Sequence, residues 1–194
     1  MNIKLLIDYI EDKNIDIDNN WYFHATDKNI EIIEKILKEG IKSAYLRKEH
    51  SSSGYNGKYY VSICKKNDNI NAYNSIYELL EHLPKFIINN VFALKTNKEN
   101  FKEFSETILP FRTSCYEDEY QVFLKINKSK IIAIEYSLYY LLESNESLIK
   151  EELEFLKKMI ICLEKNSLSI PIYDLSTNRE INKSKILSLE NFEF

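Results

Sequence analysis

Glycine is scarce in this chain, and its placement is uneven. Gly40, Gly54 and Gly57 are the three glycines among 194 residues, and all of them follow His24 within one short stretch. Glycine is used where the backbone takes a positive φ or where another molecule must approach it closely. Its confinement to this stretch predicts a binding cleft there.

Cysteines and long apolar runs are also few. Cys64, Cys115 and Cys162 are odd in number, far apart and without CxxC spacing, which argues against a disulfide framework and against a zinc site. No window approaches a membrane span, and Asp8 and Glu11 interrupt the apolar stripe of the first 13 residues, unlike a signal peptide. We therefore expect a cytoplasmic protein without a metal or a membrane partner, with non-classical export left open.

An excess of positive charge is missing as well. The chain has 26 Lys and Arg against 30 Asp and Glu, a formal net charge of −4, and its lysines are interleaved with acids. Such a chain has no global attraction for phosphate backbones, although nucleic acid is not excluded. Its length suits one hydrophobic core, so we predict a single domain over residues 1–194.

The spacing of the apolar residues predicts a mixed α+β chain. Helical periodicity marks four segments: 1–13, 30–37 with Gly40 as its cap, 72–83 and 148–163. Alternation, or short β-branched and aromatic runs, predicts strands over 21–24, 58–64, 86–94, 120–126, 131–136 and 169–174, with a short helix as the alternative for 86–94.

Four short segments carry the functional information. They are Tyr22-Phe23-His24-Ala25-Thr26, Glu39-Gly40-Ile41, Asn56-Gly57-Lys58-Tyr59-Tyr60-Val61-Ser62 and Glu117-Asp118-Glu119-Tyr120-Gln121-Val122. In this order they resemble the ADP-ribosyltransferase fold, in the branch related to diphtheria toxin and the poly-ADP-ribose polymerases. That branch has a strand ending in a His-Gly-Thr-like motif, a helix ending in Glu-Gly-Leu, a Gly-Ile-Tyr-Phe strand, and a late strand that opens with a catalytic glutamate before Tyr-Val-Val.

The resemblance runs from about Trp21 to Tyr136. It implies an ADP-ribosyltransferase-like split antiparallel β core with flanking helices over about 21–136. The segment 137–194 would then supply a C-terminal helix and strand that complete or brace this core.

NAD is the substrate that the resemblance implies, with His24, Tyr60 and Glu119 as the catalytic residues. His24 matches the histidine that hydrogen-bonds the adenosine ribose, and Glu119 matches the catalytic glutamate. The implied NAD-binding residues are His24, Ala25, Thr26, Tyr60, Ser62 and Tyr73.

One of these residues departs from the family pattern, and one further residue resembles a different branch of the family. Ala25 stands where glycine is usual, which narrows the cleft by a methyl group. Glu117 echoes the Glu-x-Glu pair of the arginine-modifying toxins, and this makes it an acceptor-side candidate.

The implied chemistry suits these residue types. Breaking the bond between nicotinamide and ribose builds positive charge on the sugar, a state that glycosidases stabilise with a carboxylate. Glu119 would supply that carboxylate, and a tyrosine would orient the nicotinamide ring by stacking. The expected activity is transfer of ADP-ribose from NAD to an unidentified protein or nucleic acid, with release of nicotinamide. The acceptor, the oligomeric state and a role as toxin, defence protein or effector stay open.

Each site residue also has a structural interpretation. His24 could be a core histidine, Tyr59 could take the place of Tyr60 on the cleft side, and Tyr73 could be a helix-packing residue. The acidic run 117–119 could be a solvated strand edge.

Other functions also fit parts of the sequence. One is a catalytically silent module of the same fold that binds NAD, ADP-ribose or a protein. An RNA 2′-phosphotransferase shares the fold, but its arginine-rich and histidine-containing motifs are not found here. A general interaction protein with an aromatic-rich surface is a third alternative.

Overall fold

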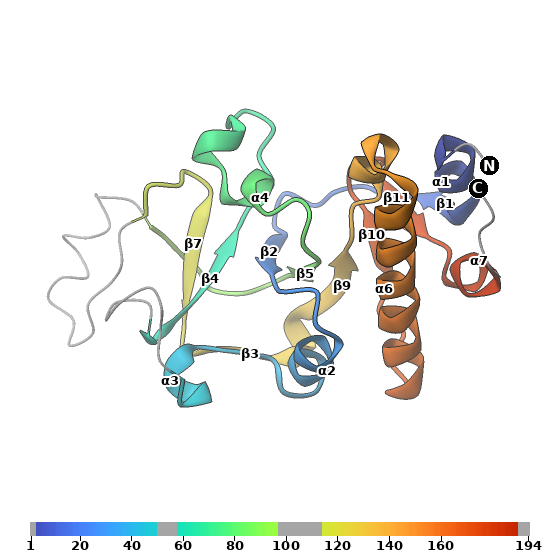
Figure 1. Cartoon of the computed structure of the whole chain (residues 1–194). Coiled ribbons are helices and arrows are strands. Elements are labelled where there is room, and N and C mark those ends of the chain that lie inside the picture. Colours follow the sequence, from blue (N-terminus) through green and yellow to red (C-terminus); the bar gives the residue numbers. More distant parts are fainter. Residues whose placement is uncertain (1–2, 50–57, 97–113, 190–194) are drawn as a thin grey trace, which may run out of the picture.

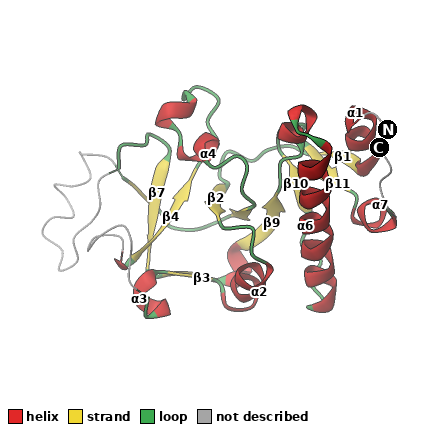
Figure 2. Ribbon diagram, viewed as in Figure 1, coloured by secondary structure: helices red, strands yellow, loops and turns green. Residues whose placement is uncertain are grey.

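The protein is a mixed α+β structure built on a large, mostly antiparallel sheet (Figures 1 and 2), which confirms the predicted class. The computed structural model describes residues 3–49, 58–96 and 114–189. Its α-helices are α1 (Ile3–Ile10), α2 (Ile30–Glu39), α3 (Ala44–Arg47), α4 (Ile76–Leu79), α6 (Glu146–Lys165) and α7 (Lys183–Ser188), with 3-10 turns η2 (Ala72–Asn74), η3 (Lys128–Lys130) and η4 (Tyr139–Glu143). In the described part of the chain, no helix is both long enough and apolar enough to cross a bilayer.

The main sheet has the strand order β1-β11-β10-β9-β5-β2-β4-β7-β6, and a second, two-stranded sheet pairs β3 with β8. Strand β10 runs parallel to β9, and the other described pairs are antiparallel. The strands are β1 (Glu11–Asn14), β2 (Tyr22–Ala25), β3 (Ile41–Lys42), β4 (Tyr60–Cys64), β5 (Lys85–Ile88), β6 (Leu94–Lys95), β7 (Glu119–Phe123), β8 (Lys125–Ile126), β9 (Ile131–Glu135), β10 (Ile172–Asp174) and β11 (Arg179–Ile181).

The sheet is weakly joined between β2 and β4. Their register contains one residue pair, Phe23 with Cys64, whereas β4 pairs with β7 over five residues and β2 with β5 over four. The ladder thus stops after Cys64 in the direction of Tyr60, and the polar groups of the two strands need other partners beyond this point.

Both faces of the sheet are covered by apolar side chains. The larger cluster joins residues of α1, α2 and α6 to one face, and it includes Val61, Ile63 and Val122. The smaller cluster lies on the other face and is built from Phe23, Cys64, Tyr77, Ile87, Ala133 and Leu175. Alternation along β4 therefore sends Tyr60 and Ser62 to the same face as Cys64.

Most of the predicted elements are present. The helix predictions at 30–37 and 148–163 are confirmed by α2 and α6, and the strands predicted at 21–24, 58–64 and 131–136 by β2, β4 and β9. Gly40 closes α2 with a positive φ of 82°, as predicted, but its ψ of 176° differs from the left-handed helical cap that we expected. The first helix is α1, which ends at Ile10 because the chain then enters β1.

The continuous helix predicted over 72–83 is wrong. The chain forms η2 and the single turn α4 instead, because Asn71 and Ser75 each accept a backbone N–H with their side chains and start a new short helix. Such local hydrogen bonds compete with a continuous helix.

Two predicted strands are interrupted. The alternating segment 120–126 breaks at Leu124, which takes φ 58°, so β8 leaves the main sheet and pairs with β3. The segment 86–94 breaks at Asn90, with φ 56°, into β5 and β6. A positive φ at a residue other than glycine is uncommon, and apolar alternation carries no signal for it.

The structure also contains elements without an apolar signature in the sequence. Strand β1 is the polar segment Glu-Asp-Lys-Asn, and it pairs with β11 near the C-terminal end of the described chain. Figure 1 shows α1, β1, β11 and α7 together at one side of the molecule.

Candidate functional site

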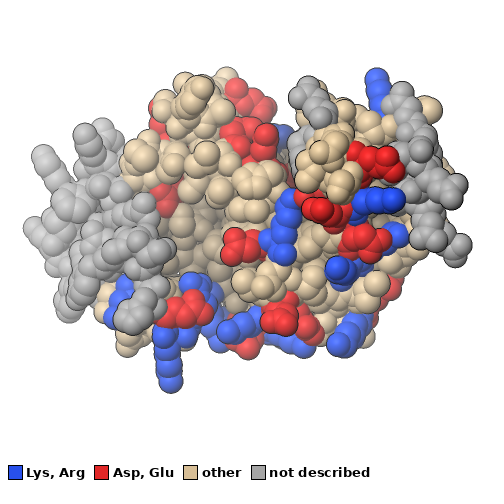
Figure 3. All heavy atoms as spheres, viewed as in Figure 1, with Lys and Arg blue, Asp and Glu red and all other residues tan. Residues whose placement is uncertain are grey.

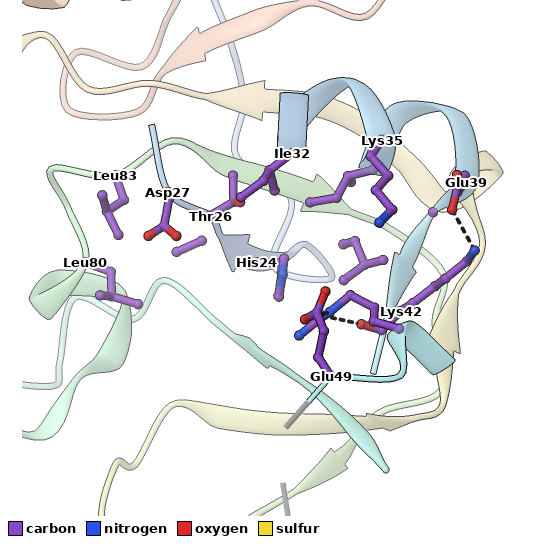
Figure 4. A pocket seen from close by; sticks show the side chains of 15 residues that line it. His24, Thr26, Asp27, Ile32, Lys35, Glu39, Lys42, Glu49, Leu80 and Leu83 are labelled. Atoms are coloured by element: carbon purple, nitrogen blue, oxygen red, sulfur yellow. Dashed lines mark hydrogen bonds and ion pairs between the residues drawn. The ribbon is translucent and has the colours of Figure 1, made fainter. Parts of the chain in front are cut away.

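A cavity of about 440 Å³ opens beside the weak junction of the sheet. It is lined by His24, Ala25 and Thr26 from the end of β2 and by Glu39, Gly40 and Ile41 from the end of α2. Figure 4 shows His24 between Lys35 and Lys42 on one side and Leu80 and Leu83 on the other. The size is within the range of small-molecule sites. Two of the four predicted motifs therefore form one wall of a cavity.

His24 closes the gap between β2 and β4. Its Nδ1 lies 2.8 Å from the backbone carbonyl oxygen of Ser62, at a point where the ladder between the strands has ended. Burial lowers the pKa of His24, the Ser62 carbonyl opposes this shift, and the charge of Arg47 adds to the lowering. The imidazole is therefore neutral at pH 7.

Ser62 connects the histidine to the glutamate. Its hydroxyl donates a hydrogen bond to Oε1 of Glu119, while its carbonyl accepts from His24. Glu119 is buried with 2% exposure, at the position of β7 that pairs with Cys64. Three residues that are distant in the sequence thus form a hydrogen-bonded path across β2, β4 and β7.

Tyr60 lies on the same face of the sheet as Ser62 and Glu119. It pairs with Phe123, and the two ring centroids are 5.6 Å apart. Burial raises the pKa of Tyr60, so its phenol stays protonated at neutral pH. Tyr59 makes a different contact, with its ring centroid 5.0 Å from that of Tyr45.

The acidic run before β7 divides into three different environments. Glu117 is exposed and accepts a hydrogen bond from the Asn74 amide at 3.2 Å. Asp118 has 2% exposure and accepts hydrogen bonds from the Ser75 hydroxyl and from two backbone N–H groups of α4. The interpretation of this run as a solvated strand edge is therefore correct for Glu117 alone. The Asp118 carboxylate caps α4, and the Glu119 carboxylate accepts a hydrogen bond from Ser62.

The remaining predicted residues are placed as follows. Ala25 and Thr26 line the cavity, and the Thr26 N–H donates to the Pro84 carbonyl at 3.0 Å. Tyr73 is 93% exposed in η2, so its interpretation as a helix-packing residue is wrong. Tyr60, Ser62, Tyr73, Glu117 and Glu119 are not among the cavity-lining residues.

The glycine-rich stretch is described only in part. Gly40 combines a positive φ with a close backbone approach, since a Cβ there would lie 2.3 Å from the Ile126 carbonyl oxygen. Gly40 therefore ends α2 and also lines the cavity. Gly54 and Gly57, the other two glycines of the predicted cleft, lie outside the described residues.

Cations that the sequence motifs did not indicate also line the cavity. Arg47 donates from its guanidinium to the Lys42 carbonyl at 2.6 Å and pairs with Glu49 at 2.7 Å. Lys35 and Lys42 complete this side. Asp27, Glu39 and Glu49 line the same cavity, and Lys42 and Arg47 are paired with two of these carboxylates, so Lys35 is the cation that best suits a ligand phosphate. Within the described ranges, no cluster of three or more His, Cys, Asp or Glu side chains is arranged to hold a metal ion.

Comparison with known proteins adds no relative to this picture: the sequence matches no protein-family model and has no significant match to a curated protein.

Proposed function

We propose that the chain has an ADP-ribosyltransferase-like fold and transfers ADP-ribose from NAD to a macromolecular acceptor. The observation that carries the proposal is the hydrogen-bonded path from His24 through Ser62 to Glu119. It links residues from three of the four motifs on which the resemblance depends, across three neighbouring strands.

The residues have separate tasks in the proposed reaction. The bond between ribose C1′ and nicotinamide breaks, and nicotinamide leaves with the electron pair. Glu119 stabilises the resulting oxocarbenium-like sugar, Tyr60 orients the nicotinamide ring, and a nucleophile on the acceptor bonds to C1′ and loses a proton. His24 positions the ribose and does not exchange protons, consistent with its lowered pKa.

The cavity supports the binding of a dinucleotide. Its motif wall presents His24 and Thr26, and its cationic side presents Lys35 and Arg47. In the proposal, the adenosine ribose lies near His24 and the diphosphate lies near the cations, while the nicotinamide end extends across Ser62 toward Tyr60 and Glu119.

A test of the proposal is turnover of labelled NAD by the intact chain, with a cell lysate as the source of acceptors. Glu119→Gln keeps the shape of the side chain and removes the charge, so nicotinamide release and label transfer should fall by about 10²–10³-fold while NAD binding persists. Glu151→Gln is the matched control, since the same change is made on an exposed side chain of α6. Equal activity of the two variants would contradict the assigned role of Glu119.

A silent NAD-binding or ADP-ribose-binding module is the second candidate function. It is favoured by one observation: Glu119 is buried against Ser62 and does not line the cavity. The same assay separates the two functions. A module would bind NAD without releasing nicotinamide in any lysate, and Glu119→Gln would leave that binding unchanged.

A further inference from the structure

A strongly basic surface lies next to the cavity. It is formed by residues 34–49, Lys58 and residues 125–130, and we call it the basic surface. It carries nine Lys and Arg side chains against three Glu, in a chain whose net charge is −4. The cations are Lys35, Lys38, Lys42, Arg47, Lys48, Lys58, Lys125, Lys128 and Lys130.

Tertiary contacts join these segments into one surface. Strand β3 pairs with β8, so that Lys42 lies directly opposite Lys125. The end of α2 meets the start of η3, because Gly40 packs against the backbone of Ile126 and Lys128. Like charges opposite each other in a strand pair are destabilising. The fold thus brings together cations that a purely structural role would keep apart.

The three glutamates neutralise only part of this charge. Each one pairs with a single cation: Glu34 with Lys38, Glu39 with Lys42 and Glu49 with Arg47. Among the described residues, the other six cations form no ion pair with a carboxylate. In Figure 3, Lys and Arg side chains project along the lower margin with Asp and Glu side chains between them, where Figure 1 places α2, β3 and α3.

Aromatic side chains are interleaved with the cations. Tyr45 is 49% exposed, and its ring centroid lies 5.0 Å from that of Tyr59. The Nζ of Lys58 is 5.8 Å from the centroid of each ring. Exposed rings among cations are the combination that binds single-stranded nucleic acid, where bases stack on aromatic side chains and phosphates meet Lys or Arg.

The basic surface is continuous with the cavity. Lys35, Lys42 and Arg47 belong to the surface and also line the cavity beside His24 (Figure 4). A chain held along the surface therefore passes the cavity in which the adenosine ribose and the diphosphate of NAD would bind.

We propose that the basic surface binds single-stranded nucleic acid and that this nucleic acid is the acceptor of ADP-ribose. The inference rests on the proposed function. In the step it implies, the C1′–nicotinamide bond breaks and nicotinamide leaves with the electron pair. A base nitrogen of the acceptor then bonds to C1′ and releases its proton, or an anionic phosphate oxygen bonds to C1′ with no proton to release. An acidic peptide would match the cations but not the aromatic rings, so charge and stacking together favour nucleic acid.

Binding is tested by fluorescence anisotropy with labelled DNA and RNA oligonucleotides of about 20 nucleotides. Lys125→Glu with Lys128→Glu should weaken binding at least about tenfold and reduce the slope of log K against log salt by about 1.4, since each phosphate contact on a single strand contributes about 0.7. Lys150→Glu with Lys158→Glu makes the same charge change on exposed residues of α6 and should alter neither quantity.

The variant Tyr45→Ala distinguishes the contribution of aromatic stacking to binding from the contribution of charge. This variant should weaken oligonucleotide binding about tenfold and leave the binding of polyglutamate unchanged. Thermal melts of all variants verify that they fold. The inference is overturned if the wild-type chain fails to bind either oligonucleotide at low salt, if both double variants lose affinity equally, or if phosphatidylserine vesicles bind and oligonucleotides do not.

The acceptor role is tested with labelled NAD and the better-bound oligonucleotide. Label should appear on the oligonucleotide with the wild-type chain and be lost with Glu119→Gln, which still binds it. Nicotinamide release without oligonucleotide binding overturns this inference and leaves the proposed function standing. Oligonucleotide binding with no turnover of NAD overturns the proposed function, and the acceptor role with it.

Discussion

The protonation state of His24 can be assigned from one hydrogen bond. A carbonyl oxygen only accepts hydrogen bonds, so the Nδ1 of His24 must carry the proton that it shares with Ser62. Because burial lowers the pKa of this imidazole, Nε2 is an unprotonated acceptor at pH 7. His24 therefore offers an acceptor to a ligand hydroxyl, and in the proposed function that hydroxyl belongs to the ribose of NAD.

Tyr60 and Tyr59 provide a matched pair of variants at the residue scale. Tyr60 shares a face with Ser62 and Glu119, whereas Tyr59 packs against Tyr45. We expect Tyr60→Ala to weaken NAD binding about threefold to tenfold, because a stacked aromatic contact is worth roughly 0.5–1.5 kcal/mol. Tyr59→Ala should change NAD binding less.

Isothermal titration of NAD into both variants makes the comparison. A larger loss for Tyr59→Ala would mean that the ligand meets the other face of β4.

Short capped elements hold the site residues in place. Asp118 accepts the N–H groups of Ile76 and Tyr77 at the start of α4, at 2.8 and 3.0 Å, and this anchors the residue immediately before Glu119. Ser75 adds a third hydrogen bond to the same carboxylate. The buried carboxylate fixes where β7 begins, and with it the position of Glu119.

The end of α2 gives a prediction at the element scale. Gly40 has φ 82° and ψ 176°, a region reserved for glycine, and a Cβ there would lie 2.3 Å from the Ile126 carbonyl oxygen. Gly40→Ala should destabilise the fold by more than about 1–3 kcal/mol, the cost of the backbone conformation alone. Urea unfolding measures the change, with Glu39→Ala as the control at an exposed neighbour.

The loss of stability should also disturb the wall of the cavity, because Gly40 lines it. If Gly40→Ala were as stable as Glu39→Ala, the close packing of α2 on η3 would be incorrect.

At the scale of the whole molecule, two buried carboxyl groups from distant parts of the chain lie close together. Glu11 of β1 has 3% exposure and lies beside Asp174 of β10, which is fully buried. Burial raises the pKa of Glu11 to about 8, and Asp174 contributes to this, while Thr177 and Arg179 oppose it. The carboxyl therefore keeps its proton in the folded protein under conditions in which the unfolded chain loses it.

The sign of the resulting pH dependence follows. The unfolded Glu11 ionises near pH 4.5 and the folded one near 8, so the free energy of unfolding should decrease as the pH rises through this window. Each pKa unit is worth about 1.4 kcal/mol, which makes the total a few kcal/mol. Glu11→Gln should flatten the dependence and raise stability at pH 8.

Urea unfolding at several pH values between 4.5 and 8 tests this effect. Glu151→Gln on the exposed face of α6 is the control and should keep the wild-type slope. An unchanged slope in Glu11→Gln would assign the pH dependence to other groups, such as Glu135, whose pKa burial raises to about 7.

Local patterns in the sequence were sufficient for the fold class and for much of the site. The apolar spacing of α2 and α6, the short strands β2, β4 and β9, and the cap at Gly40 follow from side chains within a few residues of each other, and such patterns are visible in one segment at a time. The same holds for the motif residues His24, Tyr60 and Glu119, whose roles in NAD chemistry stay predictions.

Tertiary structure decided what depends on residues that are distant in the chain. The bridge through Ser62 requires β2 to separate from β4 after Cys64, and the burial of Asp118 requires α4 to fold over it. The net charge of −4 gave no indication of the basic surface. That surface forms because the chain turns at Leu124, which allows β8 to pair with β3. Composition and spacing determine the elements, whereas strand pairing determines which charges and hydrogen-bonding groups become neighbours.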